Sequence, residues 1–77
     1  PNLALNKVWI KVDLPGTVDV EFIVSDMTGR VIKKTEVGKI SGGQRTFELD
    51  LDFKSSGFLL LTMKADGYES SARLIKK

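Results

Sequence analysis

The stretch VDVEFIVSDMTGRV, residues 18–31, decides the fold because its apolar residues alternate with polar ones and then stop at a turn. One set of alternate positions is apolar and consists of Val18, Val20, Phe22 and Val24. The other set is mostly polar and includes Asp19, Glu21 and Ser25. A period of two predicts a strand with one face in a core. Ile23 breaks the pattern, and we expect it to lie under an edge or a loop.

The residues that follow this strand predict a tight hairpin. Asp26 can hydrogen-bond backbone two residues further on, and Gly29 tolerates a positive φ. Residues 30–37 are rich in β-branched side chains and lysine, as expected for the return strand. Residues 38–43 are then expected to form a loop.

Working outward, the same alternation recurs along the chain. We expect strands at residues 7–13, 44–51 and 69–77, separated by turn signals at 14–16, 54–57 and 66–67. Residues 58–64 are almost continuously apolar, which predicts a central strand covered on both faces. Six or seven short strands predict an all-β fold, an antiparallel β-sandwich with essentially no helix. Its expected core consists of Val8, Ile10, Val12, Val20, Phe22, Val24, Phe47, Leu49, Leu61 and Met63.

Composition argues against most chemistry. The chain has 77 residues, 12 basic and 10 acidic, with neither His nor Cys. Imidazole and thiolate metal sites, Cys and Ser–His nucleophiles, haem ligation and disulfides are therefore excluded. We expect no enzymatic activity and no cofactor. The charges are interspersed, so nucleic acid is not an expected partner, and no apolar run reaches the ~18 residues of a transmembrane segment.

The organisation indicated is a single domain over residues 1–77. The chain begins with Pro1, and no charged and apolar leader follows it. We therefore interpret it as a domain excised from a longer protein whose preceding part carries the activity.

Three side-chain groups were weighed as sites, each against an ordinary structural role. Glu48, Asp50 and Asp52 share one strand face and could collect Ca²⁺, but ~6.6 Å between successive carboxylates favours a solvated face. Trp9, between Lys7 and Lys11, could stack on sugar rings, but packing against an edge under the lysine stems is favoured.

The basic C-terminus is the third group. Residues 73–77, RLIKK, could bind an acidic partner or lipid headgroups, although lysines also protect edge strands from aggregation. We expect Leu74 and Ile75 to point to opposite faces, and Lys76 and Lys77 to stay in water. We expect this strand to be a frayed edge whose removal leaves the sandwich folded.

Five motifs in order resemble the C-terminal sorting domains of type IX secretion cargo in Bacteroidetes. The opening, residues 2–12, is similar to the family's start, with Leu3 in place of a Pro. VEFIVSDMTGRV (20–31) resembles its D-x-x-G-[RK] hairpin, and GQRTFELDL (43–51) the segment after its loop glycine. SGFLLLTM (56–63) matches an SG motif, with Leu59 in place of a preferred Tyr, and RLIKK resembles its basic-apolar end.

The resemblance implies an immunoglobulin-like sandwich that is a non-catalytic secretion signal. It implies the type IX translocon and a surface sortase as partners. The sortase commonly exchanges the domain for an anionic lipopolysaccharide, whereas some members keep the domain and use it to dock on the machinery. The resemblance also implies passage through the periplasm to the cell surface, outer membrane or medium. The positions it marks for the signal are Asp26, Gly29, Arg30, Gly43, Gly57, Arg73, Leu74, Ile75, Lys76 and Lys77.

Two other functions stay open. A carbohydrate- or protein-binding accessory sandwich could use Trp9 or Tyr68 to touch glycan. An assembly domain like those of flagellar hook-cap scaffolding has a similar sandwich and a similar D-x-x-G hairpin. A sorting domain must lie at the extreme C-terminus of its parent, whereas a sugar module can lie anywhere.

Overall fold

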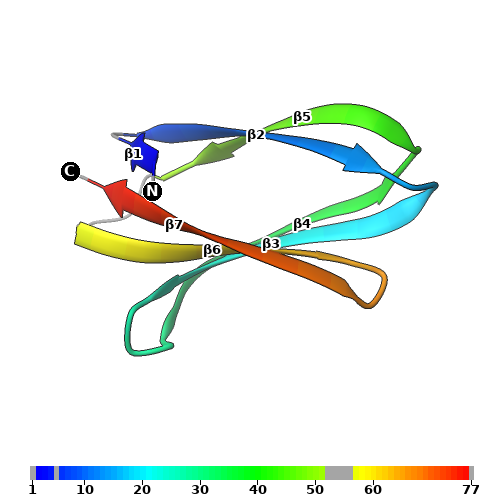
Figure 1. The fold of residues 1–77 in the computed structure, drawn as a ribbon. Coiled ribbons are helices and arrows are strands. Elements are labelled where there is room, and N and C mark those ends of the chain that lie inside the picture. Colours follow the sequence, from blue (N-terminus) through cyan, green and yellow to red (C-terminus); the bar gives the residue numbers. More distant parts are fainter. Residues whose placement is uncertain (1, 5, 52–56, 77) are drawn as a thin grey trace.

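Seven strands form the molecule, which is a computed structural model describing residues 2–4, 6–51 and 57–76. They are β1 (Asn2–Ala4), β2 (Lys7–Leu14), β3 (Val18–Asp26), β4 (Val31–Ile40), β5 (Gly43–Asp50), β6 (Gly57–Ala65) and β7 (Tyr68–Lys76). One sheet has the strand order β1-β7-β6-β3-β4, and β2 pairs with β5 in the other. Figure 1 shows the two sheets stacked face to face. The prediction of an all-β sandwich is confirmed.

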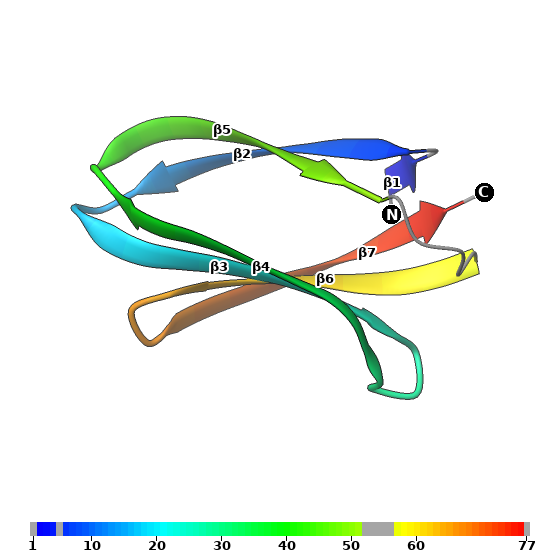
Figure 2. The same cartoon turned by 180° about the vertical axis from the view of Figure 1, so that it is seen from behind.

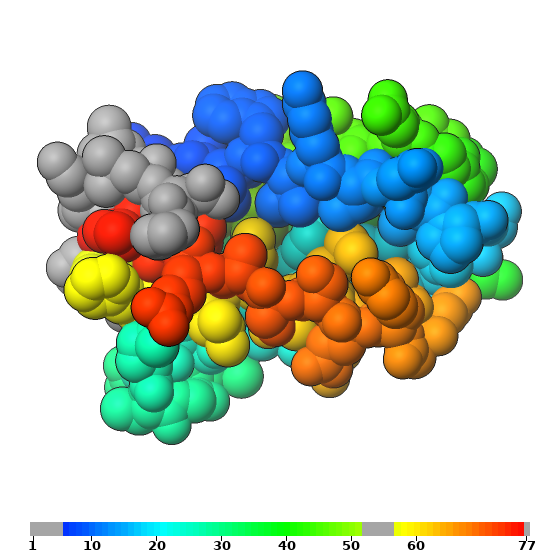
Figure 3. Space-filling view, in the orientation of Figure 1, coloured from blue at the N-terminus to red at the C-terminus, as the bar shows by residue number. Residues whose placement is uncertain are grey.

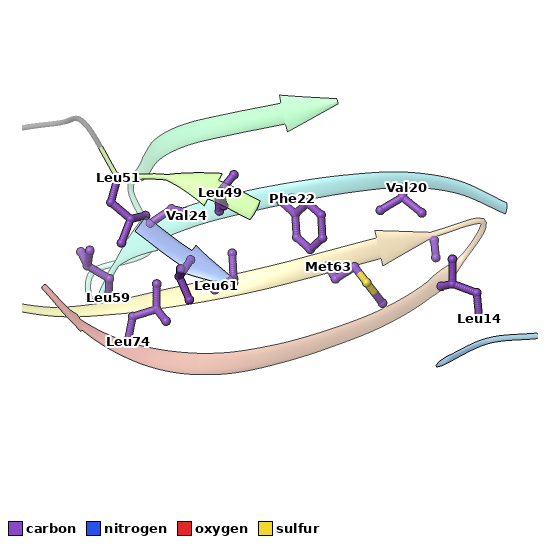
Figure 4. Packing of buried hydrophobic residues seen from close by; sticks show 12 residues of the cluster. Leu14, Val20, Phe22, Val24, Leu49, Leu51, Leu59, Leu61, Met63 and Leu74 are labelled. Carbon is purple, nitrogen blue, oxygen red and sulfur yellow. The ribbon is translucent and has the colours of Figure 1, made fainter. Parts of the chain in front are cut away.

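The core lies between the two sheets, where the inward-facing apolar side chains of β2, β3, β5 and β6 pack together (Figure 4). Phe22 of β3 packs edge-on against Phe47 of β5, with ring centroids 5.3 Å apart at 63°. Seven of the ten expected core residues are buried, and Ile10, Val12 and Phe47 pack against them half-buried. The core also contains five residues outside that expectation: Leu14, Leu51, Leu59, Ala65 and Leu74.

The predicted loop at residues 38–43 is wrong. β4 continues to Ile40, and only residues 41–42 separate it from β5, where Figure 2 shows the chain crossing from one sheet to the other. Gly38 pairs with Val20 beside a register shift in the β3–β4 ladder, so this glycine belongs to a bulge within a strand. A Cβ on Gly42 would lie only 2.8 Å from the Cα of Gly16, so the turns after β4 and β2 touch backbone to backbone.

The expectation that residues 58–64 are covered on both faces is also wrong. β6 is central, between β7 and β3, and its inward side chains are buried. However, the second sheet has two strands and lies over one face only. Phe58, on the opposite face, is therefore 58% exposed.

The last strand is not a free edge at its end. Leu74–Lys76 pair with β6 on one side and, in parallel, with β1 on the other. Leu74 is 0% exposed and Ile75 half-buried, which confirms that the terminal apolar residues pack on the sandwich. Lys76 is 8% exposed, so the expectation that it stays in water is wrong: it shares the inward parity of Leu74. Removing residues 74–77 would take out a core side chain, contrary to the expected tolerance.

Three predictions concern residues that lie partly or wholly outside the described part of the chain. Nothing is described for Asp52, for Lys77, or for residues 54–56 of the expected turn. The Asp66–Gly67 hairpin, by contrast, is confirmed, with φ of 47° and 82°.

Substitution of Gly29 tests whether the β3–β4 turn requires a positive φ at this position. The φ of Gly29 is 93°, and a Cβ there would meet nothing within 4 Å, so an alanine would be penalised through backbone conformation alone. We expect Gly29→Ala to lower stability by about 1 kcal/mol, or ~4–8 °C in Tm. Gly16→Ala is the matched control, since its added Cβ also meets nothing within 4 Å and its φ is not positive. Equal Tm values for the two variants, measured by thermal circular dichroism, would contradict the assignment.

Candidate recognition surface

The β3–β4 turn is organised around one carboxylate. Asp26 Oδ1 accepts hydrogen bonds from Thr28 N at 3.0 Å, Thr28 Oγ1 at 2.6 Å and Arg30 N at 3.0 Å. Asp26 Oδ2 accepts from Arg30 Nε at 3.1 Å, and Gly29 N donates to Asp26 O at 3.1 Å. The side chain thus takes up amide groups that the tight turn leaves without ladder partners.

These bonds stabilise the ionised carboxylate. The Thr28 hydroxyl contributes most to lowering the pKa of Asp26, followed by the amides of Arg30 and Thr28 and the Arg30 charge, against a partial desolvation that raises it. Because the pKa is lower in the folded protein, the stabilisation is present above the unfolded pKa and is lost as the pH falls through the folded one. Asp26, Gly29 and Arg30 therefore form one rigid, charged turn.

Strand register brings this turn to the C-terminal end of the last strand. Asp26 pairs with Leu59, and Leu59 pairs with Leu74. Gly57, with a φ of 96°, pairs with Lys76 at the same end. Figure 1 shows the β3–β4 turn, the start of β6 and the end of β7 at one end of the molecule, near both chain termini. We call this group, Asp26–Arg30, Gly57–Phe58 and Arg73–Lys76, the terminal end.

One position from the sequence analysis lies elsewhere. Gly43, with a φ of 104°, pairs with Leu14 at the opposite end of the sandwich. It begins β5, directly after the turn that contacts Gly16. The structure therefore separates Gly43 from the other positions that the family motifs mark.

The outer face of the five-stranded sheet adds apolar residues to the terminal end. Phe58 pairs with Ile75 of β7, and Leu60 pairs with Arg73 of the same strand. On its other side Leu60 pairs with Ser25 of β3, and Ser25 pairs with Val31 of β4. Phe58 is 58% and Val31 57% exposed. Sequence reasoning did not mark these residues as a surface. The sequence signal for such a surface was the run of four apolar residues at 58–61, because a strand buried on one face needs an apolar residue only at every second position.

The acidic face of β5 is occupied by a lysine. Lys7 Nζ lies 2.5 Å from Glu48 Oε1 and 3.8 Å from Asp50 Oδ1. The hydrogen bond that Lys7 donates to Glu48, then the charges of Glu48 and Asp50, raise the pKa of Lys7 above its ordinary value. Among the described residues no group of three or more acidic, His or Cys side chains could hold a metal ion. The solvated-face interpretation fits Glu48 and Asp50, which are both exposed.

Trp9 departs from its expected role. Its side chain is 62% exposed, on the outer face of the two-stranded sheet opposite Glu48. The expected packing against an edge or loop is therefore wrong, because no strand of the described residues lies outside β2 and β5.

The comparisons with known proteins agree with the motifs. A model of secretion system C-terminal sorting domains matches residues 1–77, so the chain belongs to this family. The domain is a C-terminal sorting signal of type IX secretion, for export across the outer membrane to the cell surface or the medium. Its function implies interaction with the type IX machinery. No match was found among curated proteins or solved structures. No helix in the described part of the chain is long and apolar enough to cross a membrane.

The Asp26 carboxylate gives a pH test. Asp26→Asn removes the charge while keeping one acceptor oxygen, so we expect a lower Tm than the parent at pH 7. The difference should begin to shrink as the pH falls below ~3.9, where the unfolded carboxylate takes up a proton, and should be lost once the pH has fallen through the lower pKa of the folded protein. Asp19→Asn, on the same strand and exposed, controls for the loss of one negative charge. A pH-independent difference between Asp26→Asn and the parent, in Tm measured from pH 7 to pH 2, would contradict the role of the charge.

Proposed function

We propose that the type IX machinery reads this domain at the terminal end. The observation that carries the proposal is the shared location: the turn, Gly57 and the last strand match separate family motifs and meet at one end of one sheet. Exposed Phe58 and Arg73 lie beside them on the outer face. An apolar anchor next to a cation is a common basis for protein recognition.

In this proposal the domain is a non-catalytic tag at the end of a longer protein. It folds in the periplasm, docks on the translocon through the terminal end and carries its parent outward. A surface sortase then removes the domain and joins the parent to an anionic lipopolysaccharide, or the domain is retained for docking. Recognition of a folded surface requires no reactive side chain, which suits a chain without His or Cys.

Exposure of Trp9 favours a second candidate, an accessory module for carbohydrate. An exposed indole beside exposed Lys11 offers a flat apolar face and a cation to a sugar ring. This surface lies on the two-stranded sheet, whereas the terminal end lies on the five-stranded sheet. Mutations can therefore separate the two functions.

The test is secretion of a reporter fused to the domain in a type IX-competent cell. We expect Phe58→Ser and Arg73→Glu to reduce surface delivery about tenfold or more, as for residues at the centre of an interface, and to leave the fusion in the periplasm. Trp9→Ser and Lys11→Glu are matched controls, an exposed aromatic and an exposed cation on the other sheet, and should be delivered normally.

Tm values of the four purified domains accompany the assay. Normal delivery of both terminal-end variants would contradict the proposal. Loss of delivery only with Trp9→Ser would also contradict the proposal, because the signal would then lie on the two-stranded sheet. Should Phe58→Ser fail to fold, Arg73→Glu alone decides, because its side chain lies in solvent on the outer face.

A further inference from the structure

One side of the sandwich is open between β2 and β7. β7 pairs with β6 along its whole length, but β1 pairs only with its last residues, Leu74–Lys76. Along residues 68–73 the other edge of β7 has no strand partner among the described residues. That edge therefore presents main-chain N–H and C=O groups to solvent.

The space beside this edge is hollow. Ser70 and Ala72 pair with buried Met63 and Leu61, so they share the inward parity, yet both are exposed. A cavity of about 70 Å³ lies between β2 and β7, lined by residues that include Ile10, Val12, Met63, Ser70 and Ala72. We call it the side groove. Figure 3 shows the recess between the blue and orange segments, with deeper strands visible at its floor.

The groove continues toward the far end of the sandwich. A second cavity, of about 240 Å³, is lined by Leu14, Pro15, Met63, Ala65 and Tyr68 among others, so the two share Met63. Together they run beside β7 from Ala72 to Tyr68. An extended chain rises ~3.3 Å per residue, so the length matches a strand of about five residues.

This edge lacks the features that usually protect an open strand. Natural edges are protected by proline, by short length or by charges that point inward. The inward residues of this part of β7 are Tyr68, Ser70 and Ala72, none of them charged. The basic residue Lys76, which we expected to protect the terminus, lies beyond it and is already paired with β1. Small inward side chains leave room for the apolar side chains of an added strand.

We propose that the side groove accepts an extended polypeptide segment from a partner protein, which adds to the free edge of β7 in line with β1. Main-chain hydrogen bonds to residues 68–73 hold the segment, and every second side chain, being apolar, enters the groove against Val12 and Met63. β1 is the precedent, since it already occupies the same row of the sheet next to Leu74–Lys76. The proposal stands apart from the secretion role and from the terminal end.

The probe is the capped peptide Lys-Thr-Val-Thr-Val-Thr-Val-Thr-Lys, titrated into the isotope-labelled 77-residue chain. We expect saturable amide shifts at residues 68–73 and 10–12, and slower hydrogen exchange along β7. Ser70→Lys and Ala72→Lys place a charged chain in the groove and should weaken binding at least about tenfold, the effect of ~1.4 kcal/mol. Gln44→Lys, exposed on β5 and outside the lining of both cavities, adds the same charge and is the control that should bind as the parent does.

Two N-methylated peptides test the main-chain pairing. One is methylated at the valines and the other at the threonines, and alternate N–H groups of a strand point to opposite edges. Only one of the two should lose binding. Binding of both, loss of both, or equal weakening by Gln44→Lys would overturn the proposal. So would β7 shifts that grow with protein concentration without peptide, because the occupant would then be a second copy of the chain.

Discussion

The contact between Phe22 and Phe47 represents the constraint on which the structure depends. In the described part of the chain the two sheets share no ladder of main-chain hydrogen bonds, so side-chain packing holds them together. A two-stranded sheet is marginally stable alone, so β2 and β5 persist because their inward residues exclude water against the larger sheet. Ile10 and Val12 belong to the same layer, and remain half-buried. The small sheet has enough apolar surface to close the middle of the core and too little width to cover the whole of its partner.

That difference in width explains where the molecule presents surface. The outer face of the five-stranded sheet has no covering layer, and its apolar residues gather around Phe58, beside the turn of Asp26 and the strand that contains Arg73. The side of β7 that extends past β2 is equally uncovered. A sorting signal of this kind consists of the shape of the folded surface and of the main-chain and side-chain groups exposed on it. It is consistent with a chain whose charged groups pair with one another, as Lys7 does with Glu48.

Sequence periodicity predicted much of this fold, and its failures have a common physical cause. Parity shows which residues share a face, and so it placed Val20, Phe22, Val24 and Leu49 in the core. It does not show which faces receive a second layer, which is why Phe58 was expected to be covered and Trp9 to be packed. β1 has three residues and no period, and only its distant partner in β7 makes it a strand. Gly38 lies in a bulge, but in the sequence a glycine indicates a loop, so the predicted strand ends at residue 37 whereas β4 continues to Ile40. For the terminal end, the family motifs marked most positions, but only register could show that Gly43 lies apart.

The pairing of β1 with β7 joins the first strand to the last. β1 therefore has no ladder partner until the last residues of this sequence have joined the sheet, and the place of Leu74 in the core stays empty until then. Contacts of such long sequence separation form late and cooperatively. A chain terminated early, by a nonsense codon or by a protease, would lack both the closing strand and the buried leucine. Formation of the complete sandwich therefore depends on residues at both ends of this sequence, Asn2–Ala4 in β1 and Leu74–Lys76 in β7.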